Sequence, residues 1–266
     1  MPQGSILGPL LFILYINDIV GASKLLHFIL FADDTNLFYS CRNFDSLIKT
    51  LNSELDKLAT WFRSNNISLN ISKTNFMFFG HKPYSITPHI LIDGILLKQV
   101  SSSKFLGVFI DTNLTWKDQI SSVSNKISRG IGALNRVKSI LSPKLLLLLY
   151  HTLIYPHLFY CCIIWGCAAQ SHLVHVRSLQ KGAVRLITNS PFRSASKPLF
   201  IKLNLFAQGD ICVLQTLQFV LCINLICYLH LVCRYLSLLN LINIIIRDNS
   251  VFLSAYLSNL ILVRCV

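Results

Sequence analysis

The stretch LHFILFADDTNLFY, residues 26–39, contains the feature on which the interpretation of this sequence depends. An apolar run is followed by the break Ala32-Asp33-Asp34-Thr35 and by a second apolar run, which predicts a β-hairpin with both carboxylates at or beside its turn. Adjacent carboxylates disfavour each other's ionisation unless a positive partner stabilises them. A divalent metal ion is such a partner, because a rigid turn with two oxygen donors leaves room for phosphate oxygens in an octahedral site. A solvated polar turn is the alternative, since Asp is a common turn residue.

The charges of the chain are distributed unevenly. Over 266 residues with 53% hydrophobic content, the formal net charge is +13. Residues 1–118 hold ten Lys and Arg against nine Asp and Glu, whereas residues 119–209 hold eleven Lys and Arg and no acid. A solvated surface could carry such a block, but its length without one carboxylate favours a polyanionic partner, with nucleic acid as the first candidate.

The nine cysteines are odd in number and irregular in spacing, so they predict neither a disulfide framework nor a zinc site. Cys162, Cys167, His172 and His175 come nearest to a ligand cluster, but they lack a Cys-x-x-Cys pair, and buried reduced thiols are the preferred interpretation. The first residues show no secretory signal. We therefore expect an intracellular protein of the nucleus or cytoplasm.

Periodicity predicts helices and strands in alternation before residue 112 and mainly helices after it. A helix is expected from about Gly8, with Pro9 in its first turn. A second, amphipathic helix is expected over residues 45–64. Further strands are expected over 76–79, 90–92 and 104–110, and later helices from Trp116, over the Pro156-interrupted segment 145–165, and over 174–187.

The last part of the chain is apolar without a clear period. Residues 211–233 contain no charged side chain, and a segment of this length could span a membrane. Gln215, Gln218, Asn224 and His230 oppose that interpretation, because each would need a partner in hydrocarbon. We expect no membrane partner, and we expect that ending the chain at Asp210 improves solubility.

Four motifs in order resemble the reverse transcriptase domain of non-LTR retrotransposons, the LINE-like elements. PQGSILGPLLFILYIND at 2–18 is similar to the template- and nucleotide-positioning motif, and FADD at 31–34 to the metal-binding motif. LNISKTNFMFF at 69–79 is similar to the lysine-bearing motif, and KFLGVFID at 104–111 to the primer grip. Weaker likeness continues through WKDQI at 116–120, YPHLFYCCIIWG at 155–166 and LQKGAVRLI at 179–187. Cys161 stands where the resemblance favours a glycine-like residue.

The resemblance implies roles for individual residues. Asp33 would ligate two Mg²⁺ ions with the support of Asp34, and Lys73 would neutralise or protonate the leaving pyrophosphate. The resemblance also implies that four residues contact the substrate: Gln3, Gly4, Leu106 and Gly107. Each has an ordinary alternative: a turn for Gln3 and Gly4, a surface lysine for Lys73, and a β-bulge for Leu106 and Gly107. Independently of the resemblance, the positive faces of the expected helices indicate nucleic-acid contacts for six cations: Lys126, Arg129, Arg136, Arg177, Lys181 and Arg185.

The expected fold is α+β, a partial right-hand polymerase palm of helix plus β-hairpin followed by an α-helical thumb. The expected domains are residues 1–111 as the C-terminal part of the palm, 112–209 as a basic helical thumb, and 210–266 as an apolar tail outside the original enzyme. The expected partners are an RNA template, a DNA primer and deoxynucleoside triphosphates.

The expected function is that of an RNA-directed DNA polymerase fragment. The family's upstream metal-binding aspartate and fingers are not found in this sequence, so the chain alone is expected to be inactive. Two alternatives stay open: a non-catalytic nucleic-acid-binding remnant, and a membrane-associated protein through residues 211–233.

Overall fold

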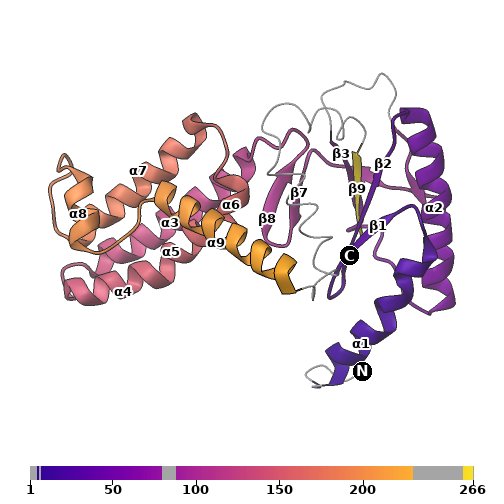
Figure 1. Cartoon of the computed structure of the whole chain (residues 1–266), viewed down its shortest axis with the longest axis horizontal. Coiled ribbons are helices and arrows are strands. Elements are labelled where there is room, and N and C mark those ends of the chain that lie inside the picture. The colour runs from indigo at the N-terminus through magenta and orange to yellow at the C-terminus, as the bar shows by residue number, and fades with distance from the viewer. Residues whose placement is uncertain (1–4, 6, 80–87, 230–259, 266) are drawn as a thin grey trace. The chain divides into compact units, whose positions relative to one another are not determined.

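The structure is a computed structural model that describes residues 5, 7–79, 88–229 and 260–265 (Figure 1). The chain divides into two compact units, Met1–Ser103 with Asn243–Val266, and Lys104–Ile242. Helices and strands occur in both, which agrees with the predicted mixture of α and β structure. The unit boundaries differ from the three predicted ranges, because part of the expected tail returns to the first unit.

The first unit begins with helix α1 (Leu7–Ile16) and the 3₁₀ helix η1 (Asn17–Ala22). The predicted hairpin follows as β1 (His27–Phe31) and β2 (Asp34–Ser40), and the predicted amphipathic helix as α2 (Phe44–Ser64). The Asn43 side chain caps α2 by accepting hydrogen bonds from the backbone N–H groups of Asp45 and Ser46. Four strands come next: β3 (Asn75–Phe79), β4 (Leu91–Ile92), β5 (Ile95–Leu96) and β6 (Lys98–Gln99).

The main sheet of this unit has the order β1-β2-β9-β3-β6, in which β9 (Leu260–Cys265) is the central strand. β9 runs antiparallel to both β2 and β3, so β2 and β3 run in the same direction and begin at the same edge of the sheet. Figure 1 shows β9 between these two strands. The hydrogen-bond ladders of β2 and β3 are thus completed by a segment from the far end of the sequence.

The core of the first unit lies between α2 and the sheet. Leu47, Leu51, Leu55 and Leu58 follow one face of α2 and are fully buried. The sheet contributes Leu37, Phe76, Phe78 and Val263 to the same cluster. The helical periodicity of the sequence predicted the α2 face correctly, because apolar residues at three- and four-residue steps share one side of a helix.

The second unit contains the hairpin strand β8 (Val108–Asp111) and most of the helices. The helices are α3 (Lys117–Val137), α4 (Pro143–Leu153), α5 (Tyr155–Phe159), α6 (Cys162–Trp165), α7 (Gln170–Ile187), α8 (Ser196–Lys202) and α9 (Gln208–Leu229). The predicted helices from Trp116 and over 174–187 are present as α3 and α7, which pack against each other. The predicted interruption near Pro156 is also present, since α4 ends at Leu153 and Pro156 lies in the first turn of α5.

The single strand predicted over residues 104–110 is wrong. The structure has two strands there, β7 (Ser102–Phe105) and β8, joined by a turn at Leu106 and Gly107. Both turn residues have positive φ, 44° for Leu106 and 86° for Gly107, and such a pair of residues reverses the chain between antiparallel strands. The sequence did not predict this turn, because the turn lies within an apolar run and Leu106 is not a usual turn residue.

The expected apolar tail is divided between both units where the structure describes it. α9 packs against α6, α5 and α7 in the second unit, and β9 belongs to the sheet of the first. Residues 230–259, which include the end of the uncharged segment, lie outside the described residues. No helix in the described part of the chain is long and apolar enough to cross a membrane.

Candidate active site and nucleic-acid interface

The carboxylate pair lies at the tip of the β1–β2 hairpin, as predicted. Phe31 and Asp34 are the last paired residues of the two strands, so Ala32 and Asp33 alone form the turn. Ala32 adopts a φ of 50°, the left-handed region that L-residues with a Cβ rarely adopt. The Asp33 side chain is exposed, and Asp34 at the start of β2 is half-buried. Two carboxylates that differ in exposure are thereby held at one tight turn.

The hairpin is a rigid support for this pair. Residues Thr35 to Phe38 are all buried, and the Asn36 amide donates a hydrogen bond to the Ile29 carbonyl across the hairpin, at 3.5 Å. Asn36 is only 1% exposed, and its Oδ1 atom has no hydrogen-bond partner among the described residues. A buried amide that bridges both strands restricts how far the turn can twist.

Lys73 lies at the same edge of the sheet as the carboxylates. Asn36 of β2 and Asn75 of β3 both pair with Arg264 of β9, so they stand at the same level on either side of the central strand. Asp34 and Lys73 each precede those positions by two residues. Because β9 lies between β2 and β3, the backbones of these two strands are two strand spacings apart, about 10 Å, at the level of Asn36 and Asn75. The sequence placed these residues in separate motifs, and the register of β9 brings them to one edge.

Local hydrogen bonds fix the backbone at Lys73. Its N–H donates to the Asn70 carbonyl at 3.1 Å, and the Thr74 hydroxyl donates to the same carbonyl at 3.0 Å. The lysine side chain is exposed, whereas Thr74 is buried. A long cationic side chain at an anchored position can reach an anion bound at the sheet edge.

The carboxylate pair fits a magnesium site of the kind completed by substrate. Mg²⁺ commonly takes one or two protein carboxylates and fills its other positions with water and phosphate oxygens. The turn provides the exposed Asp33 carboxylate and the half-buried Asp34 carboxylate. Within the ranges that the structure describes, no group of three or more His, Cys, Asp or Glu side chains could hold a metal.

The predicted primer-grip residues form the turn between β7 and β8. The Tyr160 hydroxyl donates to the Leu106 carbonyl at 2.6 Å, and a Cβ added at Gly107 would lie 3.5 Å from the Tyr160 ring. The turn is also anchored from β8, because the Asp111 carboxylate accepts from the Thr115 and Trp116 N–H groups at 2.9 Å, just before α3. Gln3 and Gly4 lie outside the described residues.

The six predicted cations lie on two helices, and they differ in how far their side chains are already engaged. Lys126, Arg129 and Arg136 lie on α3, where Arg129 and Arg136 are exposed and Lys126 is half-buried. Burial, and then the charges of Lys126 and Arg129, lower the pKa of His157 on α5, which shows that this part of α3 is positive.

The three cations of α7 differ in the hydrogen bonds that their side chains make. Arg177 donates to the Gln208 side chain at 3.0 Å and to the Gln170 side chain at 2.6 Å. Arg185 donates to the Ser194 carbonyl at 3.0 Å and lies over the Phe192 ring. Lys181 between them is exposed. Two of the three predicted contacts are therefore engaged in holding loops and helices of this unit.

A cluster of side chains that was not part of the predicted site lies between α3 and α7. Lys117, His172 and His175 line a pocket there with three hydroxyl- or amide-bearing residues. From the sequence, His172 and His175 were considered only as candidate zinc ligands. Their three-residue spacing on a helix, opposite the start of another basic helix, was the signal that could have paired them with Lys117.

The comparisons with known proteins identify the class to which this hairpin and sheet belong. Residues 1–110 match the family model described as reverse transcriptase (RNA-dependent DNA polymerase). This part of the chain therefore belongs to the reverse transcriptase family, which confirms the resemblance seen in the four motifs.

The curated relatives are polymerases of mobile elements. The chain is 31% identical over 200 residues to "Probable RNA-directed DNA polymerase from transposon X-element" of Drosophila melanogaster, covering 71% of this chain and 21% of that protein. It is 30% identical over 217 residues to that of transposon BS and 25% identical over 223 residues to that of mobile element jockey, both from the same organism and covering 77% and 79% of this chain. In each of these two cases it covers 24% of the relative. The chain thus spans about a quarter or less of each relative's length. No solved structure matches.

Proposed function

We propose that this chain provides part of the palm and thumb of an RNA-directed DNA polymerase that copies a transposon RNA into DNA. The observation that carries the proposal is that Asp33 and Asp34 lie at the same edge of the sheet as Lys73, within the segment that matches the family model. Residues 1–111 correspond in this proposal to the palm, and residues 112–209 to the basic thumb. The RNA template, the DNA primer, deoxynucleoside triphosphates and an intracellular location follow from the same proposal.

The residues of this edge divide the chemistry of nucleotide addition among them. Asp33 and Asp34 would hold Mg²⁺, which when bound stabilises the charge that develops on the transferred phosphoryl group. Lys73 would approach the leaving pyrophosphate, where a positive donor stabilises developing negative charge and can transfer a proton. The Leu106–Gly107 turn belongs to the second unit, and by the resemblance it would support the primer end, since a position without a Cβ permits close approach.

The carboxylates are tested directly by metal binding. Mn²⁺ serves as a paramagnetic probe for the full chain, measured by electron paramagnetic resonance, with Mg²⁺ as competitor. Asp33→Asn removes one of two charged ligands and should weaken Mn²⁺ binding at least tenfold, which corresponds to about 1.4 kcal/mol. Asp56→Asn is the matched control, because Asp56 is exposed on α2 in the same unit. Equal affinities for both variants would remove the metal role of the hairpin.

The polymerase role is tested by primer extension on an RNA template. The full chain alone is expected to give no template-dependent product, because the described residues bring only two carboxylates to the sheet edge and two-metal transfer needs more fixed negative ligands. The segment transplanted into the X-element polymerase in place of its aligned residues should extend the primer, and Asp33→Asn in that chimera should abolish extension. A chimera that stays active with Asp33→Asn would refute the catalytic assignment.

Nucleic-acid binding without catalysis is the second candidate function. The eleven Lys and Arg of residues 119–209, with no acid among them, support it independently of the carboxylates. A chain that binds RNA or DNA but shows no Asp33-dependent metal site would favour this function over polymerisation.

A further inference from the structure

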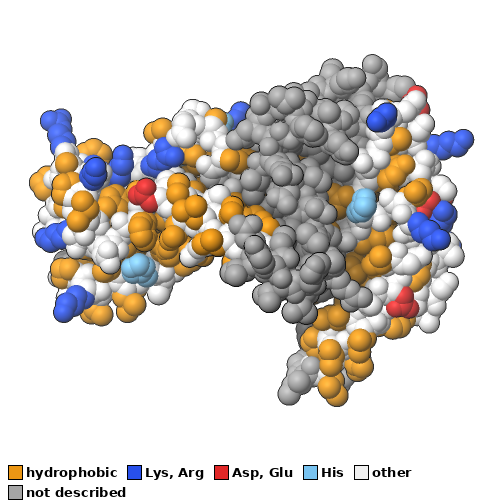
Figure 2. Space-filling view, in the orientation of Figure 1, with side chains coloured by type: hydrophobic (Ala, Val, Ile, Leu, Met, Phe, Trp, Pro, Cys, Tyr) orange, Lys and Arg blue, Asp and Glu red, His pale blue; other side chains and the backbone are white. Residues whose placement is uncertain are grey.

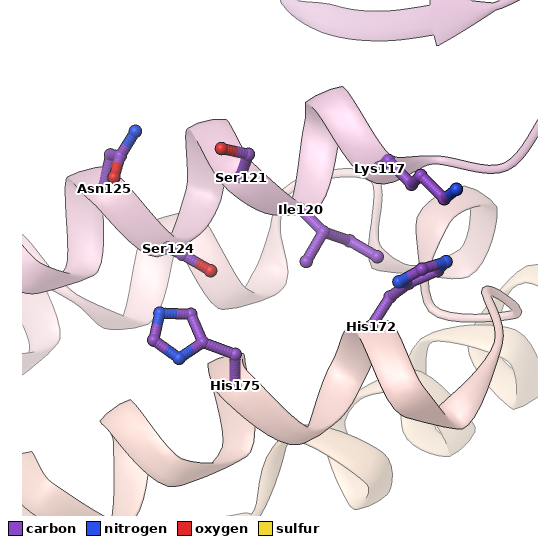
Figure 3. A pocket seen from close by; sticks show the side chains of 7 residues that line it. All are labelled: Lys117, Ile120, Ser121, Ser124, Asn125, His172 and His175. Atoms are coloured by element: carbon purple, nitrogen blue, oxygen red, sulfur yellow. The ribbon is translucent and has the colours of Figure 1, made fainter.

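The pocket between α3 and α7 in the second unit has no role in the proposed polymerase site. Figure 3 shows its seven lining side chains, of which Ile120, Ser124 and His175 point into the gap between the two helices. They are Lys117, Ile120, Ser121, Ser124 and Asn125 from α3, and His172 and His175 from α7. The cavity volume is about 240 Å³.

The lining is rich in hydrogen-bond donors and has no carboxylate. Lys117 and both histidines can carry positive charge, and each histidine has at least one ring N–H in either protonation state. Figure 3 shows the Lys117 and His172 side chains extending toward the same end of the gap, and His175 toward Ser124. Asp118 is exposed in the first turn of α3 and does not line the pocket.

Ser124 provides a second and independent indication of a ligand. The residue is only 4% exposed, and its hydroxyl has no hydrogen-bond partner among the described residues. In Figure 3 the hydroxyl points into the gap near His175. A buried hydroxyl left without a partner costs about 1–3 kcal/mol, so an acceptor placed in this pocket would remove that cost.

The helix ends add a favourable field for an anion. Lys117 is the first residue of α3 and His172 lies in the first turn of α7, so the end of the pocket at these two residues lies beside two helix N-termini, where the helix dipole is positive. No acidic residue occurs in the first turn of α7.

We propose that this pocket binds a phosphodiester group of a nucleic-acid backbone, with Lys117, His172 and His175 as charged or polar donors and Ser124 as the buried donor. The inference rests on the proposed function, because it names the group of the nucleic acid that the second unit holds. A cavity of this size is below the range of about 300–1,000 Å³ typical of whole small-molecule ligands, which favours one phosphate with its sugar. Phosphate contacts of this kind fix position and carry no sequence information.

The test measures binding of the full chain to a labelled single-stranded RNA and to an RNA–DNA duplex by fluorescence anisotropy over a range of salt concentrations. Lys117→Gln combined with His172→Gln should weaken binding of both probes about tenfold and reduce the salt slope by about one phosphate contact. Ser124→Ala removes a donor without changing charge, so it should weaken binding roughly threefold and leave the slope unchanged.

Matched controls are available outside the pocket. Lys24→Gln with His27→Gln makes the same chemical changes at exposed positions outside the acid-free cationic stretch, and Ser128→Ala makes the serine change at an exposed position of α3. Both controls should bind as the unmodified chain does. Thermal unfolding identifies any variant that loses its fold, and if Ser124→Ala does so, the Lys117 and His172 variant decides the proposal.

The outcomes separate this inference from the proposed function. If the unmodified chain binds neither probe, the nucleic-acid function fails and the pocket assignment fails with it. If the unmodified chain binds and the pocket variants bind equally well, only the pocket assignment is wrong. Competition with deoxynucleoside triphosphate and with inorganic phosphate distinguishes the sources of phosphate. Pocket variants that lose triphosphate competition while keeping oligonucleotide affinity would overturn the phosphodiester assignment.

Discussion

Single residues of this chain adopt conformations that serve the site at some cost. Ala32 and Cys161 both have positive φ, 50° and 52°, where glycine is favoured because it lacks a Cβ. Cys161 is the position where the motif resemblance favoured a glycine-like residue, and the structure supplies the conformational reason. Ala32 and Asp33 form a turn of two residues, and the Asp33 side chain is exposed there.

Tyr150 provides a pH-dependent prediction at the residue scale. Burial raises the pKa of Tyr150 to about 12 from its ordinary value of 10.0, although a hydrogen bond from Gln180 opposes the shift. The protonated phenol therefore stabilises the folded state fully below pH 10, and this contribution is lost as pH rises through about 12. The free energy of unfolding should fall by about 2 kcal/mol between these pH values.

The measurement is urea denaturation at several alkaline pH values, comparing the unmodified chain with Tyr150→Phe. The variant should lose this tyrosine's share of the pH slope while other tyrosines keep theirs. An identical slope in both proteins would show that Tyr150 ionises alike in the folded and unfolded states.

At the scale of elements, β9 has the largest structural consequence. It supplies the hydrogen-bond partners of both β2 and β3, and Val263 on it is fully buried between Leu37 and Phe76. The sequence predicts that ending the chain at Asp210 improves solubility. The same truncation would also remove β9, which leaves β2 and β3 without their central partner and exposes their edges, so this effect would lower solubility.

Val263→Asp tests the contribution of this strand. A buried unpaired charge in the centre of a sheet should reduce the free energy of unfolding of the first unit by at least about 3 kcal/mol. Val20→Asp is the matched control, because Val20 is 51% exposed in the same unit and should change stability by less than about 0.5 kcal/mol. Chemical denaturation followed by Trp61 fluorescence reports on this unit. Equal stability of the two variants would place β9 outside the folded sheet.

The β7–β8 turn gives a prediction with an internal control of opposite sign. Gly107→Ala forces a Cβ at a φ of 86° beside the Tyr160 ring and should destabilise the second unit by about 1 kcal/mol. Gly132→Ala, in the interior of α3 with open space around it, should stabilise the same unit by about 0.5–1 kcal/mol. Thermal melts of both variants decide the matter. A destabilising effect of the same size at both positions would contradict the turn geometry.

At the scale of the whole molecule, the acid-free cationic stretch is separated along the chain from the carboxylate pair, and Figure 2 shows Lys and Arg side chains over the helices of the second unit. The carboxylates and Lys73 belong to the first unit, and the acid-free cationic stretch to the second. Affinity for nucleic acid should therefore depend strongly on salt and weakly on sequence, because release of counterions from phosphates dominates such binding.

Salt titration of the full chain should distinguish the two cationic helices. Replacing Lys126, Arg129 and Arg136 together with Gln should reduce the salt slope by up to about three contacts. Replacing Arg177, Lys181 and Arg185 should reduce it less and should also lower the melting temperature, because Arg177 and Arg185 hold other parts of the unit through hydrogen bonds. Equal slopes and equal melting temperatures for both triple variants would show that neither set is engaged within the fold.

The sequence by itself determined the local elements and the chemistry of the hairpin. The apolar runs around Asp33 and Asp34 predicted the β-hairpin, and helical periodicity predicted α2, α3 and α7, because these patterns depend on neighbouring residues alone. The order of the motifs also identified the reverse transcriptase family.

Only the tertiary structure decided which distant segments complete the sheet and the pockets. A six-residue apolar strand such as β9 has no distinctive period, and its place between β2 and β3 depends on hydrogen-bond ladders formed across most of the chain. The same pairing places Lys73 at the edge of the sheet where Asp34 lies. The packing of α3 on α7 likewise joins Lys117 to His172, since contacts between helices depend on their faces and not on their separation in sequence.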